Sequence, residues 1–196
     1  MKVNKVFLFL CVFLTAHADV NTPPKFSNYP VNIKHGAFVE EVDFSDRQEM
    51  YSEKWKKLMR NSILNPVNFS GHYVIYISKN GELPEECGDD GWVCGWIIDK
   101  INGKIVLELP AFNGNTKYYS IIDNGTPSPN LFDAEFYATS SMLWIRGQNI
   151  PANGKAGEDR CANVAYDFKS DLFIKLFSGE CEIDLGSIPN ADHNLP

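Results

Sequence analysis

The spacing of apolar residues predicts a helix in one segment near the start of the chain, between residues 45 and 65. Its stripe consists of four residues spaced at i, i+4, i+7 and i+8: Tyr51, Trp55, Leu58 and Met59. Charged residues fill the positions between them, so one face should pack on a core and the other should face solvent. Ser45 and Gln48 match a capping box, and Pro66 disfavours helical geometry in the residue before it. We therefore predict one continuous amphipathic helix.

Most of the chain after this helix has the short apolar or alternating runs that are typical of β-strands. The predicted strands cover 69–78, 92–101, 104–109, 117–122, 135–138, 141–146, 163–169 and 172–177. Asn-Gly occurs five times between such runs, and Asn102-Gly103 predicts a two-residue hairpin turn. Short strands separated by turn signals indicate an antiparallel meander. We expect a mainly β, α+β fold: a sandwich-like or strongly curved sheet with the single helix on one face.

One strand is apolar on both of its faces. In N-F-S-G-H-Y-V-I-Y-I, residues 68–77, Tyr73 and Ile75 share one face, while Val74 and Tyr76 share the other. Such a strand is expected at the centre of the fold, covered on both sides. Gly71 at its beginning suggests a bulge or a close approach of another backbone segment.

The last predicted hairpin differs, because apolar and charged residues alternate in its first strand. Val164, Tyr166 and Phe168 alternate with Asp167 and Lys169. One face of this hairpin should therefore be buried and the other solvated.

The first eighteen residues have the organisation of a signal peptide. Lys2 and Lys5 precede nine apolar residues at 6–14, and Ala16 and Ala18 have the A-x-A arrangement that signal peptidase recognises. Nine apolar residues are too few to span ~30 Å of hydrocarbon, which disfavours a membrane anchor. We expect cleavage after Ala18, export to a bacterial periplasm, and a mature chain without a membrane span.

Cleavage would leave 178 of the 196 residues, about the length of one domain. Proline-rich stretches lie near both ends. We expect a signal peptide at 1–18, an N-terminal arm at 19–42, a single globular domain at 43–181, and a C-terminal tail at 182–196.

The charge of the chain bears on its partners. Loss of the signal peptide changes the balance from 18 basic and 25 acidic residues to 16 and 25, a net charge of −9. Nucleic-acid binding depends on clustered Lys and Arg, which this acidic chain lacks. The same charge suits a cationic protein partner.

Four cysteines remain after cleavage: Cys87, Cys94, Cys161 and Cys181. An even number in an exported chain favours two disulfides, with three possible connectivities. Proximity in the sequence favours Cys87–Cys94 and Cys161–Cys181. A zinc site is the alternative, but these spacings match no C-x2-C ribbon or finger. We expect neither a metal nor another cofactor.

His72 is the first candidate for chemistry. A catalytic role needs a nucleophile or a second titrating group within ~3 Å of the ring. Ser70, two residues away on the same face, would lie roughly 7 Å off at strand geometry. No G-x-S-x-G, H-E-x-x-H or phosphate-binding loop is present. We favour a structural histidine whose neutral ring bridges main-chain groups of neighbouring strands.

Asp89 and Asp90 are the second candidates, in the stretch E-C-G-D-D-G-W-V-C-G-W. Paired acids with aromatic platforms occur in sugar-cleaving sites. Adjacent acids in a loop point apart, however, and usually form turns. A catalytic role for this pair is the weaker interpretation.

A binding role is the stronger interpretation of the same stretch. A short disulfide-closed loop that presents acids and indoles is pre-organised, which lowers the ordering cost of association. A second acidic loop precedes Cys161. The predicted binding residues are Asp89, Asp90, Trp92, Trp96, Glu158 and Asp159.

Together, N-F-S-G-H-Y at 68–73, the cysteine pair after it and G-W-I-I-D-K-I-N-G-K-I-V-L-E-L-P at 95–110 resemble a family of small exported bacterial proteins. Its members carry Asn-Phe-Ala-Gly-His-Tyr, a tight Cys-Gly-x-x-Cys, and an Ile-Ile-Asp strand that ends in a Gly-Lys-Val hairpin. The resemblance covers 68–109, and it is weaker in S-M-L-W-I-R-G and the last hairpin. It implies a fold and a compartment, because the family has no settled activity. Here Ser70 replaces the alanine, and six residues separate Cys87 from Cys94.

Three functional hypotheses follow. The first is an exported, non-catalytic binding protein that neutralises a secreted toxin or an envelope-acting hydrolase, as an inhibitor or immunity protein. The second is a periplasmic hydrolase acting on envelope glycan or ester substrates, with His72 or the pair Asp89 and Asp90 at its centre. The third is a component of envelope maintenance with no single ligand.

Overall fold

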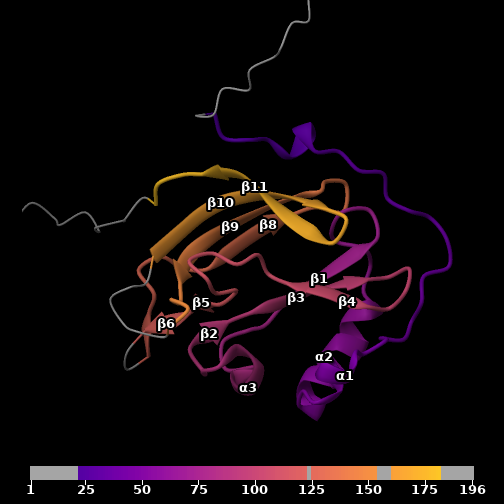
Figure 1. Cartoon of the computed structure of the whole chain (residues 1–196), viewed down its shortest axis with the longest axis horizontal. Helices are drawn as coiled ribbons and strands as arrows, with labels where there is room; N and C mark the ends of the chain where they lie inside the picture. The colour runs from indigo at the N-terminus through magenta and orange to yellow at the C-terminus, as the bar shows by residue number, and fades with distance from the viewer. Residues whose placement is uncertain (1–21, 123–124, 154–159, 182–196) are drawn as a thin grey trace, which may run out of the picture.

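The chain forms two antiparallel sheets that pack face to face, with one helix on the outer side of the smaller sheet (Figure 1). The computed structural model describes residues 22–122, 125–153 and 160–181. The helices are η1 (Phe26–Asn28), α1 (Asp46–Glu49), α2 (Glu53–Ile63) and α3 (Pro84–Cys87). The strands are β1 (Tyr73–Ile77), β2 (Trp92–Val93), β3 (Gly95–Asp99), β4 (Ile105–Glu108), β5 (Tyr118–Tyr119), β6 (Ile121–Ile122), β7 (Thr126–Pro127), β8 (Asp133–Phe136), β9 (Met142–Asn149), β10 (Arg160–Lys169) and β11 (Leu172–Ser178).

The smaller sheet has the order β1-β3-β4, and the larger has the order β11-β10-β9-β5-β2, with β8 paired to β9. Strands β6 and β7 form a separate pair. Every strand pair in the described part of the chain is antiparallel. The predicted mainly β, α+β fold with antiparallel sheets is therefore confirmed. No helix among these residues is long and apolar enough to cross a membrane.

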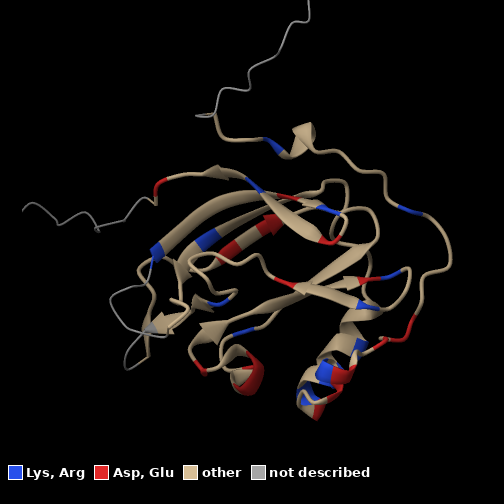
Figure 2. Ribbon diagram, viewed as in Figure 1, with Lys and Arg blue, Asp and Glu red and all other residues tan. Residues whose placement is uncertain are grey.

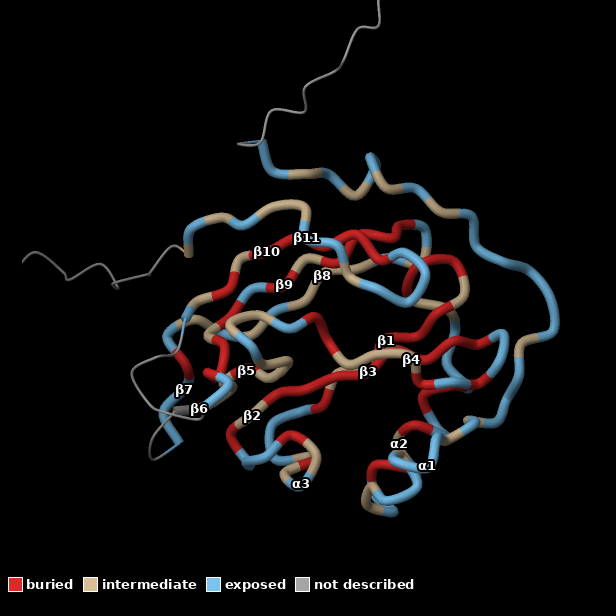
Figure 3. Tube along the Cα trace, in the orientation of Figure 1, coloured by how far each residue is buried: buried red, intermediate tan, exposed pale blue. Residues whose placement is uncertain are grey.

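Strand β1 lies between two cores, as its apolar faces predict. Tyr73 and Ile75 pack in the core between the two sheets. Val74 packs in a second core, formed with α2 on the other side of the smaller sheet. Since successive residues of a strand point to opposite faces, one apolar strand serves both cores. Figure 3 shows β1 and β3 as mainly buried segments through the middle of the molecule.

The predicted single helix is wrong in one respect, because it is interrupted after Glu49. Ser45 begins α1 with the predicted capping box. A second cap then starts α2, where the Ser52 hydroxyl accepts a hydrogen bond from Trp55 N at 3.1 Å. The backbone N–H of Ser52 donates to Glu86 Oε1 at 2.9 Å, so it is not part of a helical ladder. A contact with α3, distant in sequence, thus divides the helix.

The predicted two-residue turn at Asn102-Gly103 is also wrong. A four-residue loop joins β3 to the start of β4, since Asp99 N donates to Lys104 O at 2.8 Å. The Asp99 carboxylate lengthens this loop by accepting a hydrogen bond from Ile101 N at 2.8 Å. Gly103 has a φ of +79°, and a Cβ there would overlap the Glu41 carbonyl oxygen. The loop therefore needs glycine at this position.

The predicted solvated face of the last hairpin is only partly solvated. Asp167 is 5% exposed and accepts a hydrogen bond from the Ser141 hydroxyl at 2.5 Å. Ser141 N in turn donates to Tyr29 O, in the N-terminal segment that runs along the top of the molecule in Figure 1. Asp167 is thus buried where Ser141, the residue before β9, donates to it, which alternation along one strand cannot indicate.

Both predicted disulfides are present. Cys87–Cys94 has a Cα–Cα distance of 5.4 Å and joins α3 to the residue before β3. Cys161–Cys181 has a Cα–Cα distance of 6.1 Å and closes the open end of the hairpin of β10 and β11. Two disulfides are typical of a chain that folds in an oxidising compartment. The predicted signal peptide at 1–18 and tail at 182–196 lie outside the described residues.

Candidate functional site

The segment from Cys87 to Cys94, here called the acidic loop, is held by main-chain hydrogen bonds as well as by its disulfide. Helix α3 begins with proline, which suits the first turn, and ends at Gly88 in the left-handed conformation. Asp89 Oδ1 accepts from Gly91 N at 2.8 Å, and Asp90 O accepts from Gly81 N at 2.8 Å. Gly91 O accepts from Ser120 N at 2.8 Å. The loop therefore has one well-defined backbone conformation.

The structure separates the predicted binding residues of this region into two groups. Asp89 and Asp90 are exposed, and Trp92 is half-buried with its ring edge-on to Tyr119, 6.3 Å between centroids. Trp96 is instead 3% exposed and belongs to the second core, which the smaller sheet forms with α2. Its predicted place on a binding surface is wrong, since alternation along β3 turns its ring beneath α2.

A glycine allows the half-buried position of Trp92. A Cβ added at Gly88 would lie 2.8 Å from the Trp92 ring, in a backbone with a φ of +103°. Only glycine tolerates both the conformation and the close ring. The indole thus packs over the end of α3, with part of its surface accessible beside the two aspartates.

Five acids lie between residues 82 and 90: Glu82, Glu85, Glu86, Asp89 and Asp90. No Lys or Arg lies between Lys79 and Lys100. Figure 2 shows α3 as a predominantly acidic segment at one edge of the molecule. These five carboxylates fall within nine consecutive residues, on α3 and the segments on either side of it, so their negative potentials add.

Not all five carboxylates are available to a partner. Glu82 accepts hydrogen bonds from the Tyr76 hydroxyl and from Lys79 N. Burial, with this hydrogen bond, raises the pKa of Tyr76 far above its ordinary value. Glu86 accepts from Ser52 N, and its other oxygen is buried. The exposed carboxylates of the region are those of Glu85, Asp89 and Asp90.

Lys117 is a cation that contacts α3, just before the acidic loop. Its Nζ donates to the main-chain oxygen of Glu86 at 2.7 Å, so it caps the end of α3. The lysine reduces the negative potential on the Glu86 side, while Asp89 and Asp90 lie beyond the helix.

His72 lies one residue before β1, in a turn built by its own motif. Asn68 donates from Nδ2 to Ile75 O at 3.0 Å and accepts from Ile75 N at 2.8 Å, which fastens the turn to the strand. Gly71 has a φ of +80°, and a Cβ there would lie 2.7 Å from Asn32 O. The predicted close approach of another backbone segment at Gly71 is therefore present, and that segment is the N-terminal arm.

The partner of His72 is a carboxylate rather than the main chain. His72 Nε2 lies 3.6 Å from Asp99 Oδ1, since the pairing of β1 with β3 places Tyr73 opposite Asp99. Burial lowers the pKa of His72, the charge of Lys34 lowers it further, and Asp99 and Asp171 oppose the shift. Asp99 was not predicted from the sequence as the partner of His72, although an acidic residue at the end of an apolar strand could have indicated a buried polar contact.

The site around His72 has no complete catalytic arrangement. The hydroxyl of Tyr73 donates to Asp171 Oδ1 at 3.1 Å, and burial raises the pKa of Tyr73 well above its ordinary value. Tyr73 therefore stays neutral and is no base. In the described part of the chain, no serine, threonine or cysteine side chain hydrogen-bonds to the imidazole. The pair of His72 and Asp99 orients a ring without an adjacent nucleophile.

We expect His72 to make the fold less stable as the pH falls. Its pKa in the fold is below 6.5, so protonation favours the unfolded chain. The stability that depends on neutral His72 is complete above about pH 6.5 and is lost as the pH falls through the folded-state pKa. His72→Gln should flatten the free energy of unfolding measured by urea between about pH 7.5 and pH 5. An unchanged pH profile would contradict this assignment.

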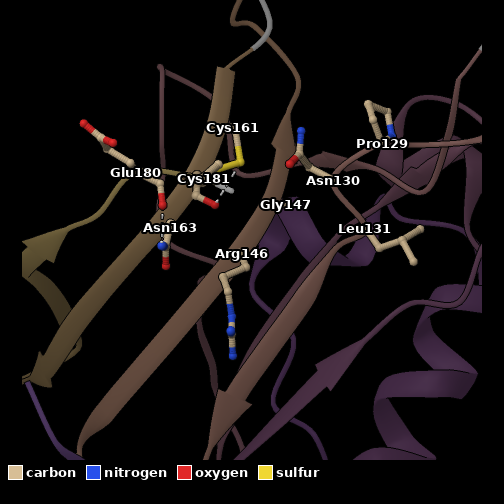
Figure 4. Close-up of a pocket in the computed structure, with 10 residues that line it drawn as sticks. Pro129, Asn130, Leu131, Arg146, Gly147, Cys161, Asn163, Glu180 and Cys181 are labelled. Carbon is tan, nitrogen blue, oxygen red and sulfur yellow. Dashed lines mark hydrogen bonds between the residues drawn. A yellow bond between two sulfur atoms is a disulfide. The ribbon is translucent and has the colours of Figure 1, made fainter. Parts of the chain in front are cut away.

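The second predicted acidic loop, with Glu158 and Asp159, lies outside the described residues. Among the described residues, a cavity of about 480 Å³ lies next to the Cys161–Cys181 disulfide. Figure 4 shows Asn163 and Glu180 on one side of this disulfide and the loop of residues 129–131 on the other. Arg146 lines the cavity, but its guanidinium pairs with Asp133 at 3.4 Å. The cavity therefore offers no unpaired charge for an anion.

Among the described residues, no group of three or more His, Cys, Asp or Glu side chains could hold a metal ion. No family model, curated protein or solved structure matches the chain. The resemblance to small exported bacterial proteins therefore stays an expectation. The functional conclusion depends on the geometry of the sites themselves.

Proposed function

We propose that this chain is an exported, non-catalytic binding protein that docks a cationic protein partner through the acidic loop. A role as inhibitor or immunity protein, neutralising a secreted toxin or an envelope-acting hydrolase in the periplasm, is the form of this function that we favour. The observation that carries the proposal is the rigid presentation of Asp89 and Asp90 beside the accessible part of Trp92.

Rigidity matters because association costs conformational entropy. A loop that is already ordered by a disulfide, two main-chain hydrogen bonds and one hydrogen bond to the Asp89 carboxylate loses little freedom on binding. An aromatic side chain beside exposed charges is the usual composition of an energetically important contact. Opposite charges on the partner would steer the encounter and favour one orientation.

A hydrolase centred on His72 is the alternative, and the ion pair with Asp99 is the observation that favours it. That reading needs a nucleophile or an activated water beside the ring. Loss of turnover on His72→Gln at unchanged stability would support it. A histidine with only a structural role gives no turnover in the unsubstituted chain.

The test of the proposal is the double substitution Asp89→Asn and Asp90→Asn. Asparagine keeps an oxygen that accepts from Gly91 N, so the turn is preserved while two charges are lost. We expect capture of the cognate partner from periplasmic extract to weaken, with Kd raised about tenfold, or about 1.4 kcal/mol. Titration calorimetry with the captured partner, at low and at physiological salt, measures the change.

Asp133→Asn is the matched control, since its side chain is 61% exposed and lies on β8, which pairs with β9 and not with β2 of the acidic loop. It removes a charge of the same sign and should leave capture unchanged. Equal weakening by the control and the loop variant would indicate a general charge effect. Full capture by the loop variant would refute the acidic loop as the docking surface.

A further inference from the structure

Strand β11 is one edge of the larger sheet. It pairs with β10 on one side, and no other described strand pairs with it on the other side. Edge strands present unpaired N–H and C=O groups and are usually protected by charge, bulges or short length. This one has seven residues, Leu-Phe-Ile-Lys-Leu-Phe-Ser, with a single charge.

The register of the hairpin shows which backbone groups face outward. Lys169 pairs with Leu172 across a two-residue turn, and Phe168 pairs with Phe173. Phe168 N donates away from β11, to Ser141 O at 2.9 Å. Its partner Phe173 therefore directs its own N–H and C=O to the free edge, and so does Lys175 two residues later.

The side chains of this edge are unusually apolar for an unpaired strand. Leu172 is 63% exposed and Ile174 is 51% exposed, and the two share one face of the strand. Figure 3 shows β11 as largely exposed or half-buried beside the buried β10. A single exposed apolar side chain needs no explanation. Two exposed apolar side chains on one edge strand, beside backbone groups that no described strand pairs with, form a surface for strand addition.

We propose that the occupant of this edge is β11 of a second copy of the chain, antiparallel and related by a twofold axis through Ile174. Phe173 of each copy then lies opposite Lys175 of the other. Each such pair exchanges two backbone hydrogen bonds, so all the outward groups of Phe173 and Lys175 find partners. The two Ile174 side chains meet at the axis and bury surface that the single copy exposes.

The charge of Lys175 disfavours one competing register and is compatible with this one. An axis through Lys175 would place two lysines directly opposite each other, which is destabilising. The axis through Ile174 places each Lys175 beside a Phe173 ring instead. It also places Lys175 diagonal to the exposed Asp171 of the other copy, within reach of a long side chain. Lys175 disfavours pairing of this edge with other strands, but it is compatible with pairing to β11 of a second copy.

The dimer goes beyond the proposed function and leaves the acidic loop free. In the strand order β11-β10-β9-β5-β2, Trp92 of β2 lies at the opposite edge from β11. Pairing through β11 therefore directs the two acidic loops to the far ends of a twelve-stranded sheet, made from two six-stranded ones. Such a dimer presents two equivalent docking surfaces, as bivalent binding requires.

Sedimentation equilibrium of the mature, oxidised chain tests the proposal. We expect a concentration-dependent dimer, and Ile174→Lys should raise its dissociation constant at least tenfold by placing two ammonium groups at the axis. The thermal midpoint should stay unchanged, because half of the Ile174 side chain is already in solvent. Leu131→Lys, at a residue 65% exposed on another surface, is the matched control and should leave the dimer intact.

Cysteine substitution tests the axis itself. Residues facing each other in a non-hydrogen-bonded pair have Cα atoms about 4.5 Å apart, within the range of a disulfide. Ile174→Cys should therefore give a covalent dimer on mild oxidation, while Leu172→Cys should not. A wild-type chain that stays monomeric at all concentrations overturns the proposal. So does a dimer that Ile174→Lys leaves intact, or a monomer whose β11 edge binds a strand of another protein.

Discussion

Replacing Trp55 with alanine is expected to lower the free energy of unfolding by about 3–5 kcal/mol. Trp55 is fully buried, and its ring contacts Tyr51, Phe44 and Trp96 at centroid distances of 4.5–5.6 Å. Alanine would leave a cavity between α2 and the smaller sheet, and neither the helix nor β3 can move to fill it without losing its other contacts. Urea unfolding followed by far-UV circular dichroism measures the loss.

Met50 supplies the control for this substitution. It lies just before α2 and is 80% exposed, so Met50→Ala should change the free energy of unfolding by about 0.5 kcal/mol or less. A loss below about 1 kcal/mol for Trp55→Ala would mean that α2 does not depend on the core beneath it. The partner's affinity per folded molecule should stay unchanged, because Trp55 is remote from solvent.

Reduction of both disulfides is expected to have the largest effect on stability. On the chain-entropy model, closing the loop between Cys87 and Cys94, seven positions apart, contributes about 2.5 kcal/mol. The bond between Cys161 and Cys181, twenty positions apart, contributes about 3 kcal/mol. Their sum is comparable to the whole stability of a typical domain, about 5–15 kcal/mol. Thermal unfolding with and without reductant measures the difference.

Pairwise replacement separates stability from binding. Alanine at Cys161 and Cys181 should destabilise the chain and leave the acidic loop able to capture its partner. Alanine at Cys87 and Cys94 should destabilise it less but weaken capture, because an ordered loop would become flexible. If both pairs weaken capture in proportion to their loss of stability, pre-organisation of the loop is not the basis of binding.

Several features follow from local sequence because the forces behind them act within a few residues or repeat with a fixed period. The capping box at Ser45 and the buried stripe of Trp55 and Met59 are of this kind. So are the two apolar faces of β1, which period two along the strand assigns without knowledge of its neighbours. The pairing of the cysteines agrees with sequence proximity, since short loops close at the lowest entropic cost.

Three of the errors arise from contacts between segments that are distant in sequence. The helix breaks at Ser52 because Glu86 of α3 accepts its N–H. Asp167 is buried where Ser141 donates a hydrogen bond to it, and the N-terminal arm in turn binds Ser141. His72 finds Asp99 only through the pairing of β1 with β3.

The features of the candidate site also fall into those that the sequence predicts and those that only the tertiary structure decides. The sequence alone predicts a disulfide-closed acidic loop and a mainly β scaffold with a helix on one face. It also shows an acidic chain with a predicted export signal. The tertiary structure alone decides that Trp96 belongs to the core while Trp92 stays partly accessible, and that β11 is left as an edge. The reason is physical: charge, period and loop closure are properties of neighbouring residues, whereas burial and strand order exist only once distant segments have packed together.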